Sequence, residues 1–213
     1  MLSKRLDALA DFVEAKSIVA DVGCDHALLL VKLAQNHKLK KGYAMDVATG
    51  PLQQALINTA SYSNIECLLS NGLEKLPLDT EIVIIAGMGY LSIKEIISSN
   101  FDKLKNLELI VQCNSQIIEF RNYLNEIGAN IIDELWVFDY KDYQFIKFNF
   151  QEKKEYSLAE IYFGPIFLKN RPSGWLVYHQ NNLLRMKDIN KKNPLKKRSE
   201  TIKLIEKTLN QLI

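Results

Sequence analysis

The stretch Ile18–Leu30, IVADVGCDHALLL, constrains the fold more than any other part of this sequence. Apolar residues from Ile18 run into Asp21-Val22-Gly23, and an apolar, helix-like run follows from Ala27. The pattern predicts a buried strand, a tight turn at Gly23 and the N-terminus of a helix. Such a turn lets a ligand approach backbone N–H groups where the helix begins. In open α/β sheets the crevice at the carboxyl ends of the strands is the usual ligand site, so we expect a site here.

The turn lacks the G-x-G-x-x-G phosphate fingerprint, because Gly23 is followed by Cys24-Asp25-His26. This disfavours a dinucleotide and favours a ligand without a pyrophosphate. An ordinary strand–turn–helix in another α/β protein is the alternative.

Strands and helices alternate over the first two thirds of the chain. Besides Ile18–Val22, apolar runs predict strands at Lys40–Asp46, Ile65–Ser70, Glu81–Ala86 and Leu107–Gln112. Helical spacing of apolar residues predicts helices at Ser3–Glu14 (capped by Ser3), Leu28–Asn36, Pro51–Thr59, Leu91–Ser98 and Ile117–Ile127. This alternation predicts a mainly parallel sheet with right-handed crossovers.

The next two runs, Ile131–Tyr140 and Tyr143–Phe150, flank Lys141-Asp142 and predict an antiparallel hairpin. A final hairpin after five strand–helix units is typical of Rossmann-like methyltransferases, whereas a dinucleotide dehydrogenase usually continues with more such units. This argument is an analogy between folds.

The pattern changes after Phe150, and we expect a second domain at residues 153–213 after a first domain at 1–152. Helices are predicted at about Trp175–Asn190 and Leu195–Leu212, with a turn at Pro194. Leu195, Ile202 and Leu209 repeat every seven residues, and Ile205 and Leu212 lie between them; the facing stripe is Leu176, Leu183, Met186 and Ile189. We therefore expect a coiled-coil-like helical hairpin.

Charge is unevenly distributed along the chain. Residues 1–150 hold 14 Lys and Arg against 19 Asp and Glu, a net −5, whereas residues 151–213 hold 13 against 6, a net +7. A basic C-terminal third suggests contact with nucleic acid, and a solvated helical face is the alternative.

Several classes of protein are disfavoured. No apolar run approaches the ~20 residues of a membrane span. The N-terminus, MLSKRLDALADF, carries acids and does not resemble a signal peptide. Cys24, Cys67 and Cys113 are odd in number and far apart, which argues against disulfides and for a reducing cytoplasm. No metal-ligand spacing, G-x-S-x-G or Walker motif is present, so we expect no metal.

Acidic and amide side chains follow the first three predicted strands. Asp46 ends the second strand, where a carboxylate can accept both hydrogen bonds of a ribose diol. Asn71-Gly72 follows the third strand, and Asn71 either contacts an adenine ring or forms a simple turn. Asp21 and Asp25 would repel phosphate but accept bonds from an ammonium group. S-adenosylmethionine (SAM) has a ribose diol, an adenine ring and an α-amino group but no phosphate, so it fits these residues better than NAD does.

Two further features lie at the same edge. His26 sits in the first turn and either contacts ligand or substrate or is a structural hydrogen-bonder. Ala86-Gly87-Met88-Gly89 follows the fourth strand, and we expect it to be a loop that faces the transferred group. Its small residues leave room for a flat base.

Seven motifs together carry a resemblance to a known family. They are LSKRL at Leu2–Leu6, ADVGCDHA at Ala20–Ala27, Gly50-Pro51, Asn71-Gly72-Leu73, IAGMG at Ile85–Gly89, QCN at Gln112–Asn114 and Phe163-Gly164-Pro165. The sequence resembles the bacterial TrmK family of SAM-dependent methyltransferases, which methylate N1 of the adenine at position 22 of tRNA. The resemblance implies a Rossmann-like class I methyltransferase domain and a C-terminal coiled-coil-like helical domain. The chain departs from the family pattern at Tyr90 (for glycine), Cys113 (for proline) and Asp46 (for glutamate).

The resemblance also implies roles for individual residues. The SAM pocket is expected to include Asp21, Gly23, Asp25, His26, Asp46, Asn71, Gly72 and Ala86. Arg5, His26, Met88, Gly89 and Tyr90 are expected towards the target base. Asp25, His26, Gly87, Met88 and Gly89 are the candidate catalytic positions.

The implied reaction is an in-line displacement at the SAM methyl group by adenine N1. N1 already carries a lone pair, so catalysis is mainly positioning. Carbonyls of Ala86–Gly89, or Asp25, would stabilise the positive charge that develops on the ring. The base must leave its stack, at a cost of a few kcal/mol that phosphate contacts elsewhere would offset.

The expected tRNA clamp is a basic cluster at the helical-hairpin turn, and we expect the enzyme to act as a monomer without membrane or metal. The cluster is Lys191, Lys192, Lys196, Lys197 and Arg198. Two other readings stay open: a SAM-dependent methyltransferase acting on a small molecule, and a non-catalytic RNA-binding protein.

Overall fold

Seven strands form one sheet in the computed structural model, which describes residues 4–212. The strand order is β3-β2-β1-β4-β5-β7-β6. The strands are β1 (Ser17–Val22), β2 (Leu39–Asp46), β3 (Ile65–Leu69), β4 (Ile82–Met88), β5 (Glu108–Cys113), β6 (Asn130–Asp139) and β7 (Lys141–Asn149). Neighbours among β1 to β5 are parallel, whereas β7 is antiparallel to both β5 and β6. The predicted parallel sheet with a final hairpin is confirmed.

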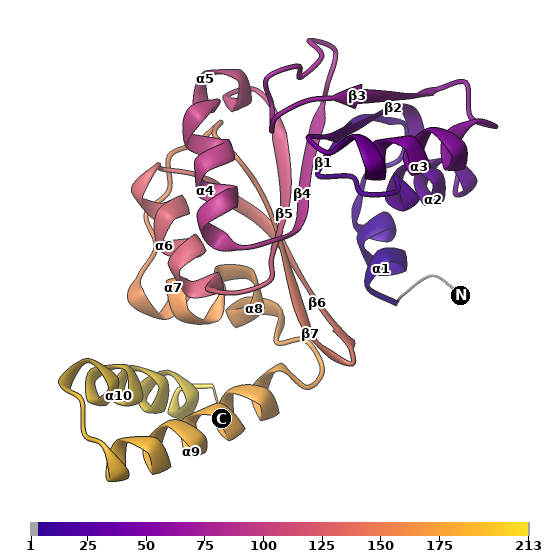
Figure 1. The fold of residues 1–213 in the computed structure, drawn as a ribbon. Helices are drawn as coiled ribbons and strands as arrows, with labels where there is room; N and C mark the ends of the chain where they lie inside the picture. The colour runs from indigo at the N-terminus through magenta and orange to yellow at the C-terminus, as the bar shows by residue number, and fades with distance from the viewer. Residues whose placement is uncertain (1–3, 213) are drawn as a thin grey trace. The chain divides into compact units, whose positions relative to one another are not determined.

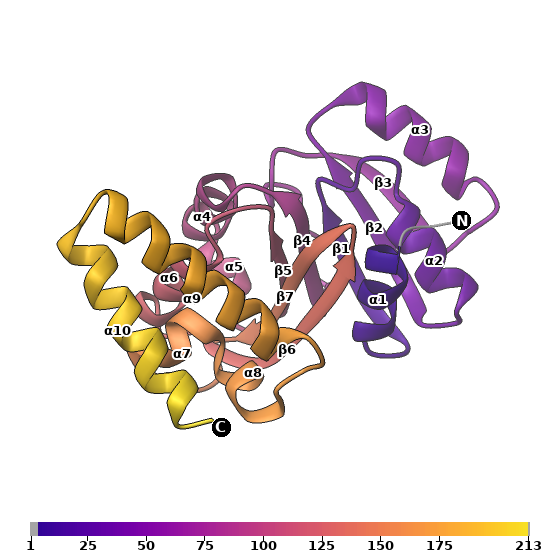
Figure 2. The same cartoon turned by 90° about the horizontal axis from the view of Figure 1, so that it is seen from below.

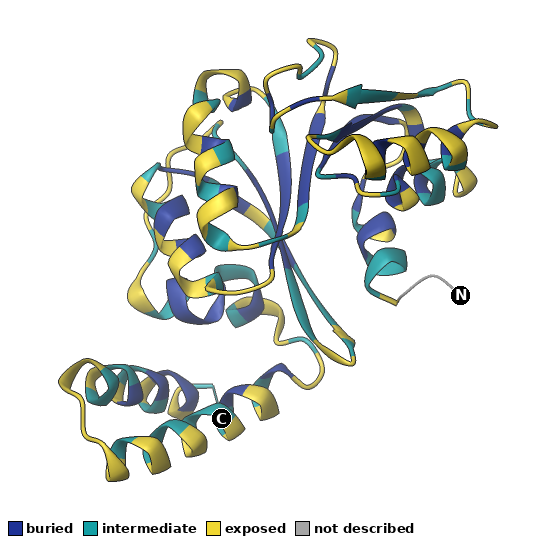
Figure 3. Ribbon diagram, viewed as in Figure 1, coloured by how far each residue is buried: buried dark blue, intermediate teal, exposed yellow. Residues whose placement is uncertain are grey.

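The centre of the sheet is buried on both faces. Every residue of β1 is buried, as are Ile82–Ile85 of β4 and Leu109–Cys113 of β5, and Figure 3 shows this burial in dark blue. Such short, β-branched runs suit strands covered on both sides by helices. The apolar stretches that most clearly predicted strands are therefore the ones that form the middle of the core.

Helices cover the two faces of the sheet. They are α1 (Lys4–Phe12), α2 (Leu28–Gln35), α3 (Thr49–Thr59), α4 (Tyr90–Ser99), α5 (Phe101–Leu104) and α6 (Ile117–Glu126). Figures 1 and 2 show α1, α2 and α3 on one face and α4, α5 and α6 on the other. The predicted cap Ser3 and the start of the LSKRL motif lie outside the described residues.

Strand β4 runs two residues further than predicted. The sequence analysis placed Gly87 and Met88 in a loop, but both belong to β4, and only Gly89 separates the strand from α4. The pairing with β5 shifts between Ala86 and Met88, and Gly87 has φ +82° there. Glycine tolerates this backbone angle, so the strand forms a bulge and then resumes pairing.

The hairpin between β6 and β7 turns one residue earlier than predicted. Lys141 and Asp142 were expected to form the turn, but both belong to β7 and pair with Asp139 and Phe138. Tyr140 alone stands at the tip, with φ +61°.

The chain forms two compact units, Met1–Lys154 and Glu155–Ile213, called here the N-terminal and C-terminal units. The C-terminal unit contains α7 (Leu158–Phe163), α8 (Pro165–Asn170), α9 (Trp175–Lys192) and α10 (Lys196–Asn210). A capping box between Ser157 and Glu160 starts α7.

Helices α9 and α10 pack as the predicted helical hairpin, but the predicted seam is wrong at its turn end. Ile202, Ile205 and Leu209 are buried, whereas Leu195 is 49% exposed and Ile189 is 43% exposed. Leu195 has extended backbone at the start of α10, so it cannot continue the heptad stripe. The other end of the hairpin is held by an aromatic cluster in which Trp175 and His179 are buried.

Candidate functional site

The turn between β1 and α2 is strained and tied to β2. Gly23, Asp25 and Ala27 have φ values of +70°, +52° and +55°. Non-glycine residues in this region are uncommon and concentrate at functional sites. The N–H groups of Gly23 and Cys24 both donate to the carbonyl of Met45, at 2.8 and 3.1 Å. These two N–H groups are therefore already engaged, contrary to the expectation that the turn offers them to a ligand.

Asp46 holds two backbone groups at the end of β2. Its Oδ2 accepts the N–H of Asp25 at 3.1 Å, and its Oδ1 accepts the N–H of Ala48 at 2.9 Å. A carboxylate offers about four acceptor positions, so two remain for a ligand. The side chain both shapes the turn and keeps capacity for a diol.

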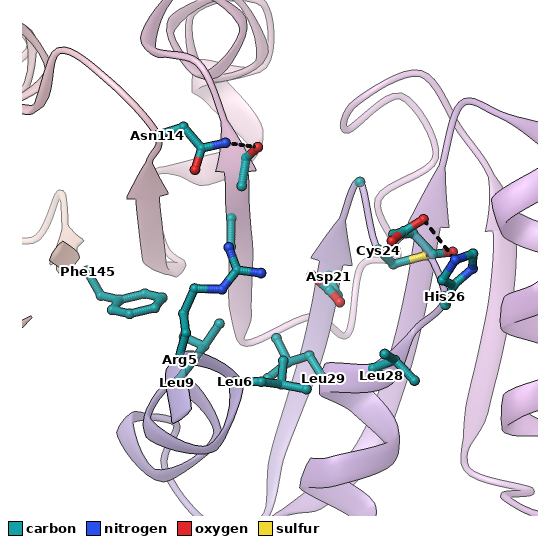
Figure 4. Close-up of a pocket in the computed structure, with 14 residues that line it drawn as sticks. Arg5, Leu6, Leu9, Asp21, Cys24, His26, Leu28, Leu29, Asn114 and Phe145 are labelled. Carbon is teal, nitrogen blue, oxygen red and sulfur yellow. Dashed lines mark hydrogen bonds and ion pairs between the residues drawn. The ribbon is translucent and has the colours of Figure 1, made fainter. Parts of the chain in front are cut away.

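Two hollows flank Gly23 at the carboxyl edge of the sheet. The first is a cavity of about 670 Å³ (Figure 4). Its walls are Arg5, Leu6, Leu9, Asp21, Gly23, Cys24, Asp25, His26, Leu28, Leu29, Ala86, Gly87, Asn114 and Phe145. The second, of about 570 Å³, is lined by Val22, Gly23, Asp46, Val47, Ser70, Asn71, Gly72, Glu74, Met88, Ser92, Glu95, Ile96, Ser99 and Asn100. The structure thus divides the predicted cofactor residues between two adjacent spaces.

Gly23 has φ +70°, a backbone angle that favours glycine, and the side chain of Met88 packs against it. A Cβ on Gly23 would lie 2.2 Å from Cε of Met88. The thioether therefore packs directly over the turn, and Met88 lines the second hollow rather than the first. The sequence had placed Met88 towards the target base.

Asp21 is the buried carboxyl group of the first hollow. Burial, with a smaller contribution from the negative charge of Asp46, raises the pKa of Asp21 to about 7. Burial also raises the pKa of the Cys24 thiol. A carboxyl group with this pKa changes its charge when a cation arrives beside it.

His26 lies beside Asp25, with Nε2 3.6 Å from Oδ1. Its Nδ1 is buried and has no hydrogen-bond partner among the described residues. The backbone carbonyl of His26 accepts the side-chain amide of Asn58 from α3 at 2.9 Å. The backbone of His26 is thus anchored, and its imidazole is partly exposed beside Asp25.

The Gly87 bulge is held by Gln112 near the end of β5 and by Asn114 one residue beyond the strand, and neither was predicted to have a role in the site. Gln112 Oε1 accepts the N–H of Gly87 at 3.1 Å, and Asn114 Nδ2 donates to the Gly87 carbonyl at 2.5 Å. Gln112 Nε2 also donates to Asn114 Oδ1 at 3.3 Å. The sequence feature that could have indicated this role is their position at the end of a buried strand, within the QCN motif.

Arg5 and Tyr90 have different surroundings. Arg5 lines the first hollow, and its guanidinium lies 5.1 Å from the centre of the Tyr143 ring. Tyr90 lines neither hollow. Burial raises the pKa of Tyr123, and the neighbouring phenol of Tyr90 adds a smaller contribution. The structure therefore does not bring Tyr90 together with the other predicted base-facing residues.

The basic cluster lies in the C-terminal unit, at the turn between α9 and α10. Lys192, Lys196 and Lys197 are exposed. Arg198 donates from its guanidinium to the carbonyl of Asn193 at 2.8 Å, and Lys191 lies 3.9 Å from Asp188. Lys191 is exposed as well but lies beside a carboxylate, so Lys192, Lys196 and Lys197 are the exposed lysines of the cluster without a nearby acid in an ion pair among the described residues.

Residues 4–212 contain neither a membrane-spanning helix nor a cluster of metal-binding side chains. No helix there is long and apolar enough to cross a bilayer. Nor does that part of the chain gather three or more His, Cys, Asp or Glu side chains in a metal-binding arrangement.

The strand order, with acidic and amide side chains gathered where β1, β2 and β3 end, defines a class I methyltransferase fold. The family described as "Methyltransferase domain" matches residues 2–146.

Similarity to individual proteins narrows the class of methyltransferases to one family. A Bacillus subtilis (strain 168) tRNA (adenine(22)-N(1))-methyltransferase is 32% identical over 139 residues, which is 63% of this chain and 58% of that relative. The matched part is therefore less than two thirds of that relative's length. A Streptococcus pneumoniae structure described as a tRNA (m1A22) methyltransferase in complex with S-adenosyl-L-methionine is 28% identical, with TM-score 0.88 over 98% of this chain and 100% of that one. M. capricolum TrmK in complex with S-adenosyl-homocysteine is 30% identical, with TM-score 0.85 over 99% and 98%. The chain belongs to the TrmK family.

Proposed function

We propose that this protein transfers a methyl group from SAM to N1 of the adenine at position 22 of tRNA. The observation that carries the proposal is the pair of hollows that meet at Gly23. One offers the free acceptor positions of Asp46 beside Asn71, and the other opens beside Ala86 and Gly87. Relatives described as tRNA methyltransferases, including a SAM complex, support the same substrates.

SAM supplies an activated methyl group. The residues that line the two hollows fit its ribose, its adenine and its α-ammonium group. We assign the two remaining acceptor positions of Asp46 to the ribose diol and the Asn71-Gly72 segment to the adenine side. Asp21 and Asp25 lie in the first hollow and supply carboxylates for the α-ammonium group. A cation there favours the ionised form of Asp21, whose pKa of about 7 lies within physiological range.

The first hollow is the proposed place of the target adenine. Gln112 and Asn114 hold the Gly87 bulge, and this fixes the backbone that faces the base. Asp25 and His26 also line this hollow. Adenine N1 needs no general base, so we assign these residues to orienting the base and offsetting its developing positive charge.

The decisive experiment is incubation of the purified protein with methyl-labelled SAM and unmodified tRNA, followed by nucleoside analysis and mapping of the modified position. Label in 1-methyladenosine at position 22 is the expected result, and tRNA with guanine at that position should stay unlabelled. Label only in a small molecule would favour the small-molecule methyltransferase. Binding of tRNA without SAM binding would favour a non-catalytic RNA-binding protein.

Replacing Asp46 with alanine is expected to weaken SAM binding by about 1–3 kcal/mol, because ribose hydroxyls and two backbone N–H groups lose their acceptor. Isothermal titration calorimetry measures the effect. Asp46→Glu keeps a carboxylate and should bind SAM more tightly than the alanine variant. Asp102→Ala, which removes an exposed carboxylate on α5, is the control and should bind like the wild type. Wild-type affinity in Asp46→Ala would remove this residue from the site.

Replacing Lys192, Lys196 and Lys197 together with glutamine is expected to lower tRNA affinity and its salt dependence. Each lost phosphate contact should reduce the log–log salt slope by up to about one unit. The matched control is Lys169, Lys203 and Lys207 to glutamine, which removes the same charge from exposed positions in the same unit. SAM affinity should not change in either variant. Identical salt titrations for the two triple variants would show that the cluster is only a solvated surface.

We propose the cytoplasm as the site of the reaction. Cys24, Cys67 and Cys113 are all free thiols, as a reducing compartment allows.

A further inference from the structure

The β6–β7 hairpin ends in two exposed aromatic side chains. Tyr140 is 98% exposed and Phe138 is 66% exposed. Tyr140 also has φ +61°, a region that glycine or asparagine occupies more easily than tyrosine. Neither the packing nor the turn geometry accounts for a tyrosine at this tip.

Two cations lie over Tyr143, a third aromatic ring of the same hairpin. The guanidinium of Arg5 and the ammonium of Lys141 lie 5.1 and 5.0 Å from the centre of the Tyr143 ring. The two nearest carboxylates are both engaged within the unit: Asp139 accepts the backbone N–H of Arg5 at 3.2 Å, and Asp142 accepts the indole N–H of Trp136 at 3.0 Å. Aromatic rings interleaved with cations are the combination that binds unstacked nucleotides.

This hairpin tip is continuous with the first hollow. Lys141, Tyr143 and Phe145 alternate along β7 and so share one face of the strand. Phe145 and Arg5 line the hollow itself. Phe145 itself is buried, so the accessible strip consists of Arg5, Tyr143 and Lys141 and runs from the hollow along β7 towards its outer end.

We propose that this strip, with Tyr140 at its tip, is an RNA-contacting surface that stacks on a nucleotide next to the methylated adenine. Phe138 is not part of the strip, because it pairs with Asp142 and so lies on the other face of the hairpin. The inference rests on the proposed function, because it takes the first hollow as the place of the adenine. An adenine presented on its Watson–Crick edge leaves its stack, and its neighbours lose a stacking partner. The exposed Tyr140 ring replaces that partner. A protein partner is the competing occupant, and it predicts no effect of Tyr140 on tRNA binding.

The test compares tRNA affinity, measured by fluorescence anisotropy, among full-length Tyr140→Ala, Tyr140→Trp and Leu78→Ala variants. Stacking on an aromatic side chain contributes about 1–3 kcal/mol per base, so Tyr140→Ala should raise the Kd for tRNA by about 5- to 150-fold. Tyr140→Trp keeps a stacking ring and should remain close to wild type. Leu78, which is fully exposed elsewhere in the N-terminal unit, controls for loss of a surface apolar group.

A second readout separates stacking from a structural role. 2-Aminopurine placed on either side of position 22 should be quenched by the wild-type and Tyr140→Trp proteins and less by Tyr140→Ala. SAM affinity and thermal stability should be the same in all variants.

Equal tRNA affinity for Tyr140→Ala and the wild type would overturn the proposal, even if methylation is normal. If the wild type binds tRNA without methylating it, the proposed function fails, while the affinity comparison still decides the role of Tyr140. Absence of tRNA binding would overturn both.

Discussion

Replacing Arg121 with leucine is expected to lower the free energy of unfolding of the N-terminal unit by about 3–5 kcal/mol, the usual cost of breaking a buried ion pair. Arg121 is 1% exposed on α6, and its Nη2 lies 2.7 Å from Oε1 of Glu134 on β6. The same nitrogen donates to Gln144 Oε1 on β7 at 2.8 Å. The variant would leave the Glu134 carboxylate, whose side chain is 0% exposed, without this partner.

Urea unfolding followed by tryptophan fluorescence measures this effect. The chain has two tryptophans, Trp136 on β6 and Trp175 on α9, so a Trp175→Phe background reports on the N-terminal unit alone. Lys105→Leu breaks an exposed ion pair of the same 2.7 Å length with Asp102 and should change little. The double variant Arg121→Leu with Glu134→Leu should recover much of the loss, because it leaves no unpaired charge. A single variant as stable as the wild type would show that Glu134 is held by other groups.

Replacing Asp21 with asparagine is expected to stabilise the ligand-free protein at neutral pH by up to about 4 kcal/mol, an effect that disappears towards pH 4. The pKa of Asp21 is raised from 3.8 to about 7 in the folded protein. Between these values the folded state holds a proton that the unfolded state has released. Stability from this group is therefore full below the unfolded pKa and is lost as the pH rises to about 7.

The difference in unfolding free energy between Asp21→Asn and the wild type, measured from pH 4 to pH 8, isolates this group from other titrations. Asp79→Asn is the control of opposite sign, because the hydrogen bond from Tyr43, together with the charge of Lys41, lowers the pKa of Asp79. Stability from Asp79 is present above its unfolded pKa and is lost as the pH falls through its folded pKa, so its replacement should destabilise the protein at neutral pH. A pH-independent difference for Asp21→Asn would mean that Asp21 ionises normally.

Much of the site could be predicted because its positions follow directly from strand ends. Asp46, Asn71 and Gly23 each lie at or just beyond the end of a strand that periodicity identifies, and parallel strands bring their carboxyl ends to one edge. Gln112 and Asn114 were missed because their role depends on β5 lying beside the Gly87 bulge. Asp46, Asn71 and Gly72 of the second hollow were predicted, but Ser92, Glu95 and Ser99 were missed because they come from α4, whose orientation local sequence does not encode.

The sequence by itself determined the order and kind of the elements, the ligand edge and the family, because hydrophobic period, turn residues and strand-end acids are local features. Only the tertiary structure decided the rest. Met88 was assigned to a loop, but pairing with Cys113 extends β4 through it, and contact with Gly23 places its side chain in the second hollow. Arg121 lies in a predicted helix, and its burial follows from Glu134 on β6 and Gln144 on β7, which bind its guanidinium. Tyr140 was expected at the end of a strand and stands exposed at the hairpin tip, since the register between β6 and β7 is set by packing along both strands rather than by the turn residues.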